Sequence, residues 1–197
     1  MHTVMTLRAA ARTALVAATV IAGLASGTAG ATTTDISSTA GTWNIFDVDN
    51  FTAQSSGTEW IDIADGSALT FTITNAAPVA ITIVDGGFAG DQFHVYDNGA
   101  LLGTTSAVAN NYPTSIGLNF DAALAGGAYS TATFFLAAGT HAITGDLAVS
   151  ALDGTGTAIN ATVGALQISA VPLPSSALLL LSSTGLLGFI ARRRRAA

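Results

Sequence analysis

Leu69-Thr70-Phe71-Thr72-Ile73-Thr74 alternates strictly between apolar side chains and threonines. Successive side chains of a β-strand point to opposite faces, so Leu69, Phe71 and Ile73 share one face and the threonines share the other. A strand with one apolar and one polar face is typical of an antiparallel sheet that is buried on one side. This stretch therefore predicts a β-sheet protein.

Shorter runs with similar alternation lie on both sides of this stretch, and Gly, Asn and Asp separate them. No run shows a sustained helical period. Together they predict nine strands, at residues 42–46, 59–63, 69–74, 79–84, 92–96, 101–104, 131–136, 141–147 and 165–169. Short strands in this number are typical of two packed sheets, so we predict an all-β fold with a single β-sandwich that is jelly-roll-like.

Local signals add detail to this fold. Asn98-Gly99 lies between two apolar runs and predicts a tight hairpin, because both residues accept a positive φ. We expect Val95 to lie across from Leu102 in that hairpin. Residues 121–125 predict a short helical turn at most, and the polar residues 32–35 are expected to be frayed, with the domain proper beginning near Gly41.

The charges are divided sharply along the chain. All six basic residues lie near its two ends, and all twelve acidic residues lie between them. Without both ends the formal charge is about −12, which excludes nucleic acid as a partner. Such a surface suits either solubility or the collection of divalent cations, and both interpretations stay open. The sequence has no Cys, which excludes disulfides and thiolate zinc sites.

Residues 1–31 have the three parts of a secretory signal peptide. Two arginines are followed by an apolar run at residues 14–24 and by small residues at 29–31. We predict that signal peptidase cleaves after Ala31 and recognises Ala29 and Ala31 by their small size. The alternative is an N-terminal membrane anchor, but this requires an apolar run of about 20 residues.

Residues 175–191 form an uncharged, Leu-rich run that predicts a transmembrane helix of ~26 Å. Arg192, Arg193, Arg194 and Arg195 follow it and favour the cytoplasmic side of the membrane. The predicted domain at residues 32–170 would then lie outside the membrane, as the signal peptide also indicates. A simple C-terminal tail anchor is the alternative interpretation.

The segment Val171-Pro172-Leu173-Pro174-Ser175-Ser176, followed by the Leu-rich run and the arginines, resembles the PEP-CTERM class of bacterial sorting signals in its VPLPA variant. Ser175 stands where that variant usually has Ala. The resemblance covers residues 171–197 and implies processing by an exosortase, an integral-membrane transpeptidase. It implies transient anchoring in the bacterial inner membrane and a final location at the cell surface or in the extracellular matrix. The two prolines disfavour a helix and keep the segment extended, where an enzyme can reach the backbone.

Residues 84–105 and 134–144 are similar to β-sandwich domains that PEP-CTERM proteins commonly carry. In outline these domains resemble carbohydrate-binding jelly rolls. The resemblance assigns no ligand residue in this chain.

Four oxygen-bearing side chains form a candidate metal site. Asp85, Asp91 and Asp97 recur six residues apart, and Asn98 follows the last of them. Hard oxygen ligands on turns at one end of a sandwich could hold a structural Ca²⁺, although the spacing is not that of an EF-hand. Asp is also favoured in turns for its own hydrogen bonding, and both interpretations stay open. No other cofactor is expected.

Aromatic and histidine side chains offer weaker signals. Tyr112 lies in a polar loop and is the candidate for stacking on a sugar ring, whereas Trp43 and Trp60 lie in predicted strands and are expected in the core. His94 and His141 lack a third metal ligand and are expected to be hydrogen-bonded or solvated. The sequence has no Gly-x-Ser-x-Gly motif, so we do not expect an enzyme.

These observations lead to two hypotheses from different classes. The first is an exported cell-surface or exopolysaccharide-matrix protein with a structural or adhesive role, sorted and processed by an exosortase. The alternative is a carbohydrate-binding module, in a calcium-dependent form if the aspartates hold Ca²⁺, with exopolysaccharide as its partner.

Overall fold

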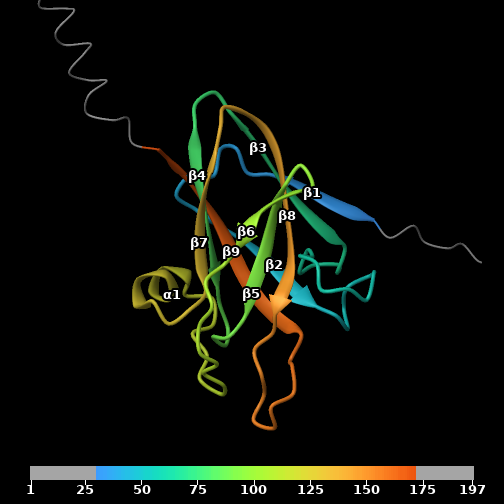
Figure 1. Ribbon diagram of the computed structural model, residues 1–197. Helices are drawn as coiled ribbons and strands as arrows, with labels where there is room; N and C mark the ends of the chain where they lie inside the picture. The colour runs from blue at the N-terminus through green and yellow to red at the C-terminus, as the bar shows by residue number, and fades with distance from the viewer. Residues whose placement is uncertain (1–29, 172–197) are drawn as a thin grey trace, which may run out of the picture.

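The structure, a computed structural model, describes residues 30–171 and contains nine strands and one short helix in this range. The elements are β1 (Ala31–Asp35), β2 (Trp43–Asp49), β3 (Ala68–Asn75), β4 (Val79–Asp85), β5 (Gln92–Asp97), β6 (Ala100–Thr104), α1 (Phe120–Gly126), β7 (Thr131–Leu136), β8 (Gly139–Val149) and β9 (Ala161–Ala170). The strands form a five-stranded sheet in the order β1-β3-β8-β5-β6 and a four-stranded sheet in the order β2-β9-β4-β7 (Figure 1). The predicted all-β fold with two sheets is therefore confirmed.

The order of the strands is that of a jelly roll. With β2 counted as the first strand, the order reads 1-8-3-6 in the four-stranded sheet and 2-7-4-5 in the other, as in an eight-stranded jelly roll. β1 is an additional edge strand and pairs with β3 in parallel. The predicted transmembrane helix at residues 175–191 lies outside the described residues.

Inward-facing side chains from both sheets share one core. Leu69, Phe71 and Ile73 are buried, while the threonines between and after them are half-buried or exposed, as their alternation predicts. Trp60 lies at the centre of this core, and Phe46 stacks on it with 3.8 Å between ring centroids. The buried face of β3 thus contributes to a core that both sheets enclose.

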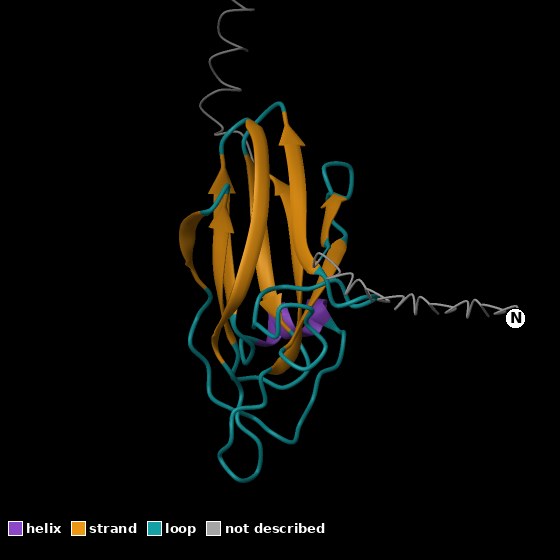
Figure 2. Ribbon diagram, turned by 90° about the vertical axis from the view of Figure 1, so that its right-hand side faces the viewer, coloured by secondary structure: helices purple, strands orange, loops and turns teal. Residues whose placement is uncertain are grey.

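Long connections gather at one end of the strands (Figure 2). We call this the loop end and define it by residues 86–91, 105–119 and 150–160, which hydrogen-bond to one another through Asn110 and Asn111. α1 begins after Asn119, whose side chain accepts a hydrogen bond from the backbone N–H of Ala122. The helix ends at Gly126 and is capped by Gly127, where φ is 66°. The predicted helical turn at residues 121–125 is confirmed.

The predicted strand at residues 59–63 is wrong. Glu59 pairs with Asp146 of β8, whereas Ile61 pairs with Asp47 of β2 and with Ala68 of β3, each through an isolated bridge. The segment therefore links the two sheets and forms no continuous ladder with either. The adjacent residues Trp60 and Ile61 are both buried, whereas Ile63 is 70% exposed, so burial in this link does not follow the alternation of a strand.

The expectation for residues 32–35 is also wrong, because they belong to β1. Ala31–Asp35 pairs with residues 68–72 of β3, and Ile36, fully buried, donates a backbone hydrogen bond to Thr72. The Asn98-Gly99 hairpin forms as predicted, with positive φ at both residues. Its register differs, since Val95 pairs with Gly103 and a β-bulge leaves Leu102 without a direct partner.

Candidate functional site

The structure separates the four predicted metal ligands into two groups. Asp85 ends β4 and Asp91 precedes β5, so both lie at the loop end. Asp97 ends β5 and Asn98 follows in the hairpin, at the opposite end of that strand. Six residues of extended chain separate Asp91 from Asp97, or about 20 Å. The predicted four-residue site therefore does not form as one cluster, because an extended strand carries its ends apart.

Asp85 and Asp91 lie together in the interior, where the chain passes from the four-stranded to the five-stranded sheet. Asp85 is 0% exposed and Asp91 is 2% exposed. Thr162 of β9 lies beside both carboxyl groups. Asp91 Oδ1 accepts a hydrogen bond of 2.7 Å from the backbone N–H of Ala151. Asp85 Oδ1, Asp85 Oδ2 and Thr162 Oγ1 are buried with no partner at full hydrogen-bonding geometry. The Thr162 hydroxyl and the backbone N–H groups of Gly86 and Asp91 nevertheless lie near Asp85 and lower its pKa against the effect of burial.

Burial changes the acidity of both aspartates. Removal from water and, to a lesser degree, the nearby charge of Asp91 together raise the pKa of Asp85 to about 9, against the opposing contacts with Gly86, Thr162 and the Asp91 N–H. Burial also raises the pKa of Asp91, against the opposing effect of the hydrogen bond from Ala151. The sequence alone did not indicate Thr162 as a member of this group, because it lies 71 residues after Asp91 in the chain.

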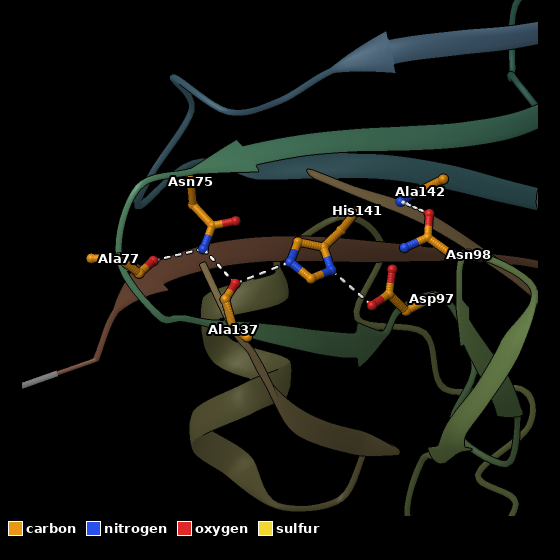
Figure 3. A network of polar contacts seen from close by, with 7 residues as sticks. All are labelled: Asn75, Ala77, Asp97, Asn98, Ala137, His141 and Ala142. Atoms are coloured by element: carbon orange, nitrogen blue, oxygen red, sulfur yellow. Dashed lines mark hydrogen bonds and ion pairs between the residues drawn. The ribbon is translucent and has the colours of Figure 1, made fainter. Parts of the chain in front are cut away.

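Asp97 belongs to a separate polar network (Figure 3). Its Oδ2 atom lies 2.7 Å from Nδ1 of His141, and Nε2 of the same ring lies 3.0 Å from the carbonyl oxygen of Ala137. The ionised carboxylate of Asp97 and the carbonyl of Ala137 can only accept hydrogen bonds. The two hydrogen bonds therefore form together only when both ring nitrogens of His141 carry a proton. Asn98 accepts a hydrogen bond from the N–H of Ala142. This network joins the β5–β6 hairpin to β8 and to the turn before it, as the expectation of a hydrogen-bonded His141 implies.

His94 is also hydrogen-bonded, on the outer face of the five-stranded sheet. Its Nδ1 atom lies 2.8 Å from Oδ1 of Asp146, and the hydroxyl of Tyr96 donates to Oδ2 of the same carboxylate at 2.9 Å. The side chains of His94 and Asp146 are each more than a third exposed. The group formed by His94, Tyr96 and Asp146 is therefore accessible to a ligand. The sequence alone indicated only that His94 and Tyr96 share a face of the strand.

The aromatic candidates have different environments. Tyr112 is 40% exposed and packs against Phe88, with 5.0 Å between ring centroids. Trp60 lies in the core as expected. Trp43 is half-buried, and its indole N–H donates a hydrogen bond of 2.8 Å to Asp121 of α1. Tyr112 therefore keeps an accessible ring, and the two tryptophans support the fold.

An acidic groove near β2 was not predicted. Its volume is about 300 Å³, and Asp47, Asp49, Asp62 and Asp65 are among its lining residues. Burial raises the pKa of Asp47, and the charge of Asp49 adds to this rise. Within residues 30–171, no group of three or more His, Cys, Asp or Glu side chains is arranged to hold a metal ion. The groove therefore carries negative charge without a metal-ligand geometry.

The terminal predictions lie almost entirely outside the described residues. Ala31 is the first residue of β1 and Val171 is the last described residue, while Ala29, Pro172, Leu173, Pro174, Ser175 and the four arginines lie outside. In the part of the chain that the structure describes, no helix has both the length and the apolar character needed to cross a membrane.

Comparisons with known proteins give one informative match. Residues 170–195 match the family model of the PEP-CTERM protein-sorting motif. A comparison with curated proteins finds no match. Among solved structures, the pre-peptidase C-terminal domain of a collagenase from Bacillus anthracis is similar, with a TM-score of 0.34 and 9% identity over 71% of this chain and 97% of that one. A likeness at this level carries no conclusion about function.

Proposed function

We propose that this PEP-CTERM protein, which carries the sorting motif at residues 170–195, is a non-enzymatic structural or adhesive protein of the cell surface or exopolysaccharide matrix. The motif implies an exosortase-type processing enzyme, export, and a cell-surface or extracellular destination. The VPLPA subtype, the signal peptide, the transmembrane helix and the transient inner-membrane anchor are parts of the same proposal.

The position of the motif supports this proposal most directly. β9 ends at Ala170, and the matched motif begins at that same residue. β9 lies between β2 and β4 and hydrogen-bonds to both. Cleavage after Val171 would leave every one of these strand pairings intact. The arrangement suits a folded module that is released without loss of structure.

The distribution of charge agrees with release from the membrane. No Lys or Arg lies between Arg12 and Arg192, so the module itself carries only carboxylates and two histidines. An acidic module has no electrostatic attraction to an anionic membrane surface. Once both ends are removed, it would remain in the aqueous matrix.

A processing experiment tests the proposal. The chain is produced in a bacterium with an exosortase of the matching subtype and in the same strain without it. We expect a shortened product in the matrix fraction only when the exosortase is present. A variant with Pro172→Ala and Pro174→Ala should remain in the membrane fraction at full length.

Pro78→Ala is the matched control, because Pro78 is exposed in the turn between β3 and β4. It should be processed normally. Equal release with and without the exosortase would contradict the sorting proposal and favour a simple anchor or a secreted protein.

A carbohydrate-binding role is the second candidate, supported by the exposed ring of Tyr112 and by the accessible His94–Tyr96–Asp146 group. Flat aromatic rings stack on the apolar faces of sugars, and carboxylates accept hydrogen bonds from hydroxyls. Pull-down on insoluble polysaccharides, with and without EGTA, tests this role. Tyr112→Ala should weaken retention and Phe135→Ala, an exposed aromatic on β7, should not. Lack of retention of the unaltered protein would remove this candidate.

A further inference from the structure

We propose that Asp85, Asp91 and Thr162 bind one Ca²⁺ at the loop end, where the chain passes between the two sheets. The first observation is the set of unpaired oxygens. Asp85 is 0% exposed, and neither of its carboxyl oxygens has a partner at full hydrogen-bonding geometry, although Thr162 and the backbone N–H groups of Gly86 and Asp91 lie near it. The hydroxyl oxygen of Thr162 is buried and unpaired as well. Buried polar atoms in proteins are nearly always paired, and Thr162 lies beside both carboxyl groups, so these three atoms together indicate a missing partner.

The second observation is the lack of a counter-charge within the module. The sequence from residue 30 to residue 171 has no Lys or Arg. Its two histidines already pair with other aspartates, His94 with Asp146 and His141 with Asp97. Two buried carboxylates without a cation are costly, so the charge must be balanced by a proton or by a bound metal ion.

The chemistry of the ligands favours Ca²⁺ over other metals. The available atoms are carboxylate and hydroxyl oxygens, which are hard ligands. Ca²⁺ accepts six to eight oxygens in irregular geometry, whereas Mg²⁺ requires a near-octahedral shell and retains several waters. Backbone carbonyls and waters would complete the shell. With only two carboxylates, we expect an affinity of about 10⁻⁴–10⁻³ M, in the range of extracellular modules.

The ion would hold together elements that are distant in the sequence. Asp85 belongs to β4, Asp91 precedes β5, and Thr162 belongs to β9. Asp91 also accepts the hydrogen bond from Ala151, which fixes the 150–160 loop. Bound Ca²⁺ would therefore stabilise the loop end and both sheets at once. This inference does not depend on the proposed sorting or adhesive role, since a protein that fails one test can pass the other.

Thermal unfolding of the exported protein, purified in mild detergent, tests the site. We compare 10 mM CaCl₂ with EGTA and with 10 mM MgCl₂. We expect Ca²⁺ to raise Tm by about 3–10 °C, as for a ligand at about 10–100 times its Kd. Mg²⁺ should raise Tm far less. Asp85→Asn and Asp91→Asn should each abolish the response to Ca²⁺.

Asp97→Asn is the matched control, since the sequence pattern alone would place Asp97 in the same site. It should keep the full Tm response, even if its baseline Tm falls. Thr162→Val retains the volume of the side chain without its oxygen and should weaken the Ca²⁺ affinity roughly tenfold. Equilibrium dialysis of the unaltered protein should find one Ca²⁺ per chain. No bound Ca²⁺, or a response that Asp97→Asn loses and Asp85→Asn retains, would overturn the proposal.

Discussion

Asp85→Asn should stabilise the protein at neutral pH when no divalent cation is present. Asp85 has no partner at full hydrogen-bonding geometry, and the one charged side chain beside it is another carboxyl group, that of Asp91. An amide in place of the carboxyl carries no charge and can donate hydrogen bonds to Asp91. The substitution therefore removes the cost of keeping this carboxyl protonated in the folded state at neutral pH, and it nearly preserves the shape of the side chain.

The pKa of Asp85 sets the magnitude and the sign of the change in the free energy of unfolding with pH. Its ordinary pKa is 3.8, and in the folded protein burial raises it to about 9. As pH rises, the carboxyl of Asp85 loses its proton in the unfolded chain first. The contribution of Asp85 to the stability of the folded state is therefore fully present below pH 3.8 and falls as pH rises to about 9. At pH 7 the accumulated loss is up to about 4 kcal/mol, at about 1.36 kcal/mol for each pH unit.

Urea unfolding in EGTA at pH 5, 7 and 8.5, followed by tryptophan fluorescence, measures this effect. The unaltered protein should lose stability as pH rises, and Asp85→Asn should show a flatter profile and a higher midpoint at pH 7. Asp153→Asn is the control with the opposite sign, because hydrogen bonds from Thr155 lower the pKa of Asp153, with smaller contributions from Thr157 and Gly156. If Asp85→Asn is less stable than the unaltered protein at pH 7, or if both have the same pH profile, the reasoning about the buried charge is wrong.

Two further pairs of substitutions test the packing and the polar network. Gly145→Ala should destabilise the protein by about 2–3 kcal/mol, because an added Cβ would meet the ring of Trp60 and lie 2.7 Å from the carbonyl oxygen of His94. Gly126→Ala, where nothing lies within 4 Å of the added atom, should change the free energy of unfolding by less than about 0.5 kcal/mol, and equal effects would contradict this account. His141→Ala should cost about 3 kcal/mol by leaving Asp97 unpaired in a largely buried position, whereas His94→Ala should cost under about 1 kcal/mol because its pair is exposed. Urea unfolding at pH 7 measures both pairs, and a His94→Ala loss as large as that of His141→Ala would refute the distinction.

The sequence predicted the elements whose signal is local. The alternation at residues 69–74 identified both the strand and its buried face, because the two faces of β3 meet different environments. Asn98-Gly99 identified a hairpin because its backbone requires a positive φ at both positions. The register of that hairpin was missed, since nothing in the local pattern indicates the bulge at Leu102.

The elements that the sequence did not predict depend on distant partners. β1 is a run of threonines that becomes a strand only by pairing with β3, more than thirty residues later. Asp97 fits the six-residue spacing of Asp85 and Asp91, but the extended backbone of β5 carries it away and toward His141. Thr162 joins the two buried aspartates only because β9 pairs with β4. Spacing along the chain does not report such contacts.

Release of the folded module from its C-terminal sorting signal leaves a defined C-terminus. Intact mass spectrometry of the mature protein from the cell surface or matrix locates this C-terminus. We predict a chain that ends between Val171 and Ser175 and lacks the four arginines. A mature, surface-located product whose mass still includes residues 175–197 would contradict it.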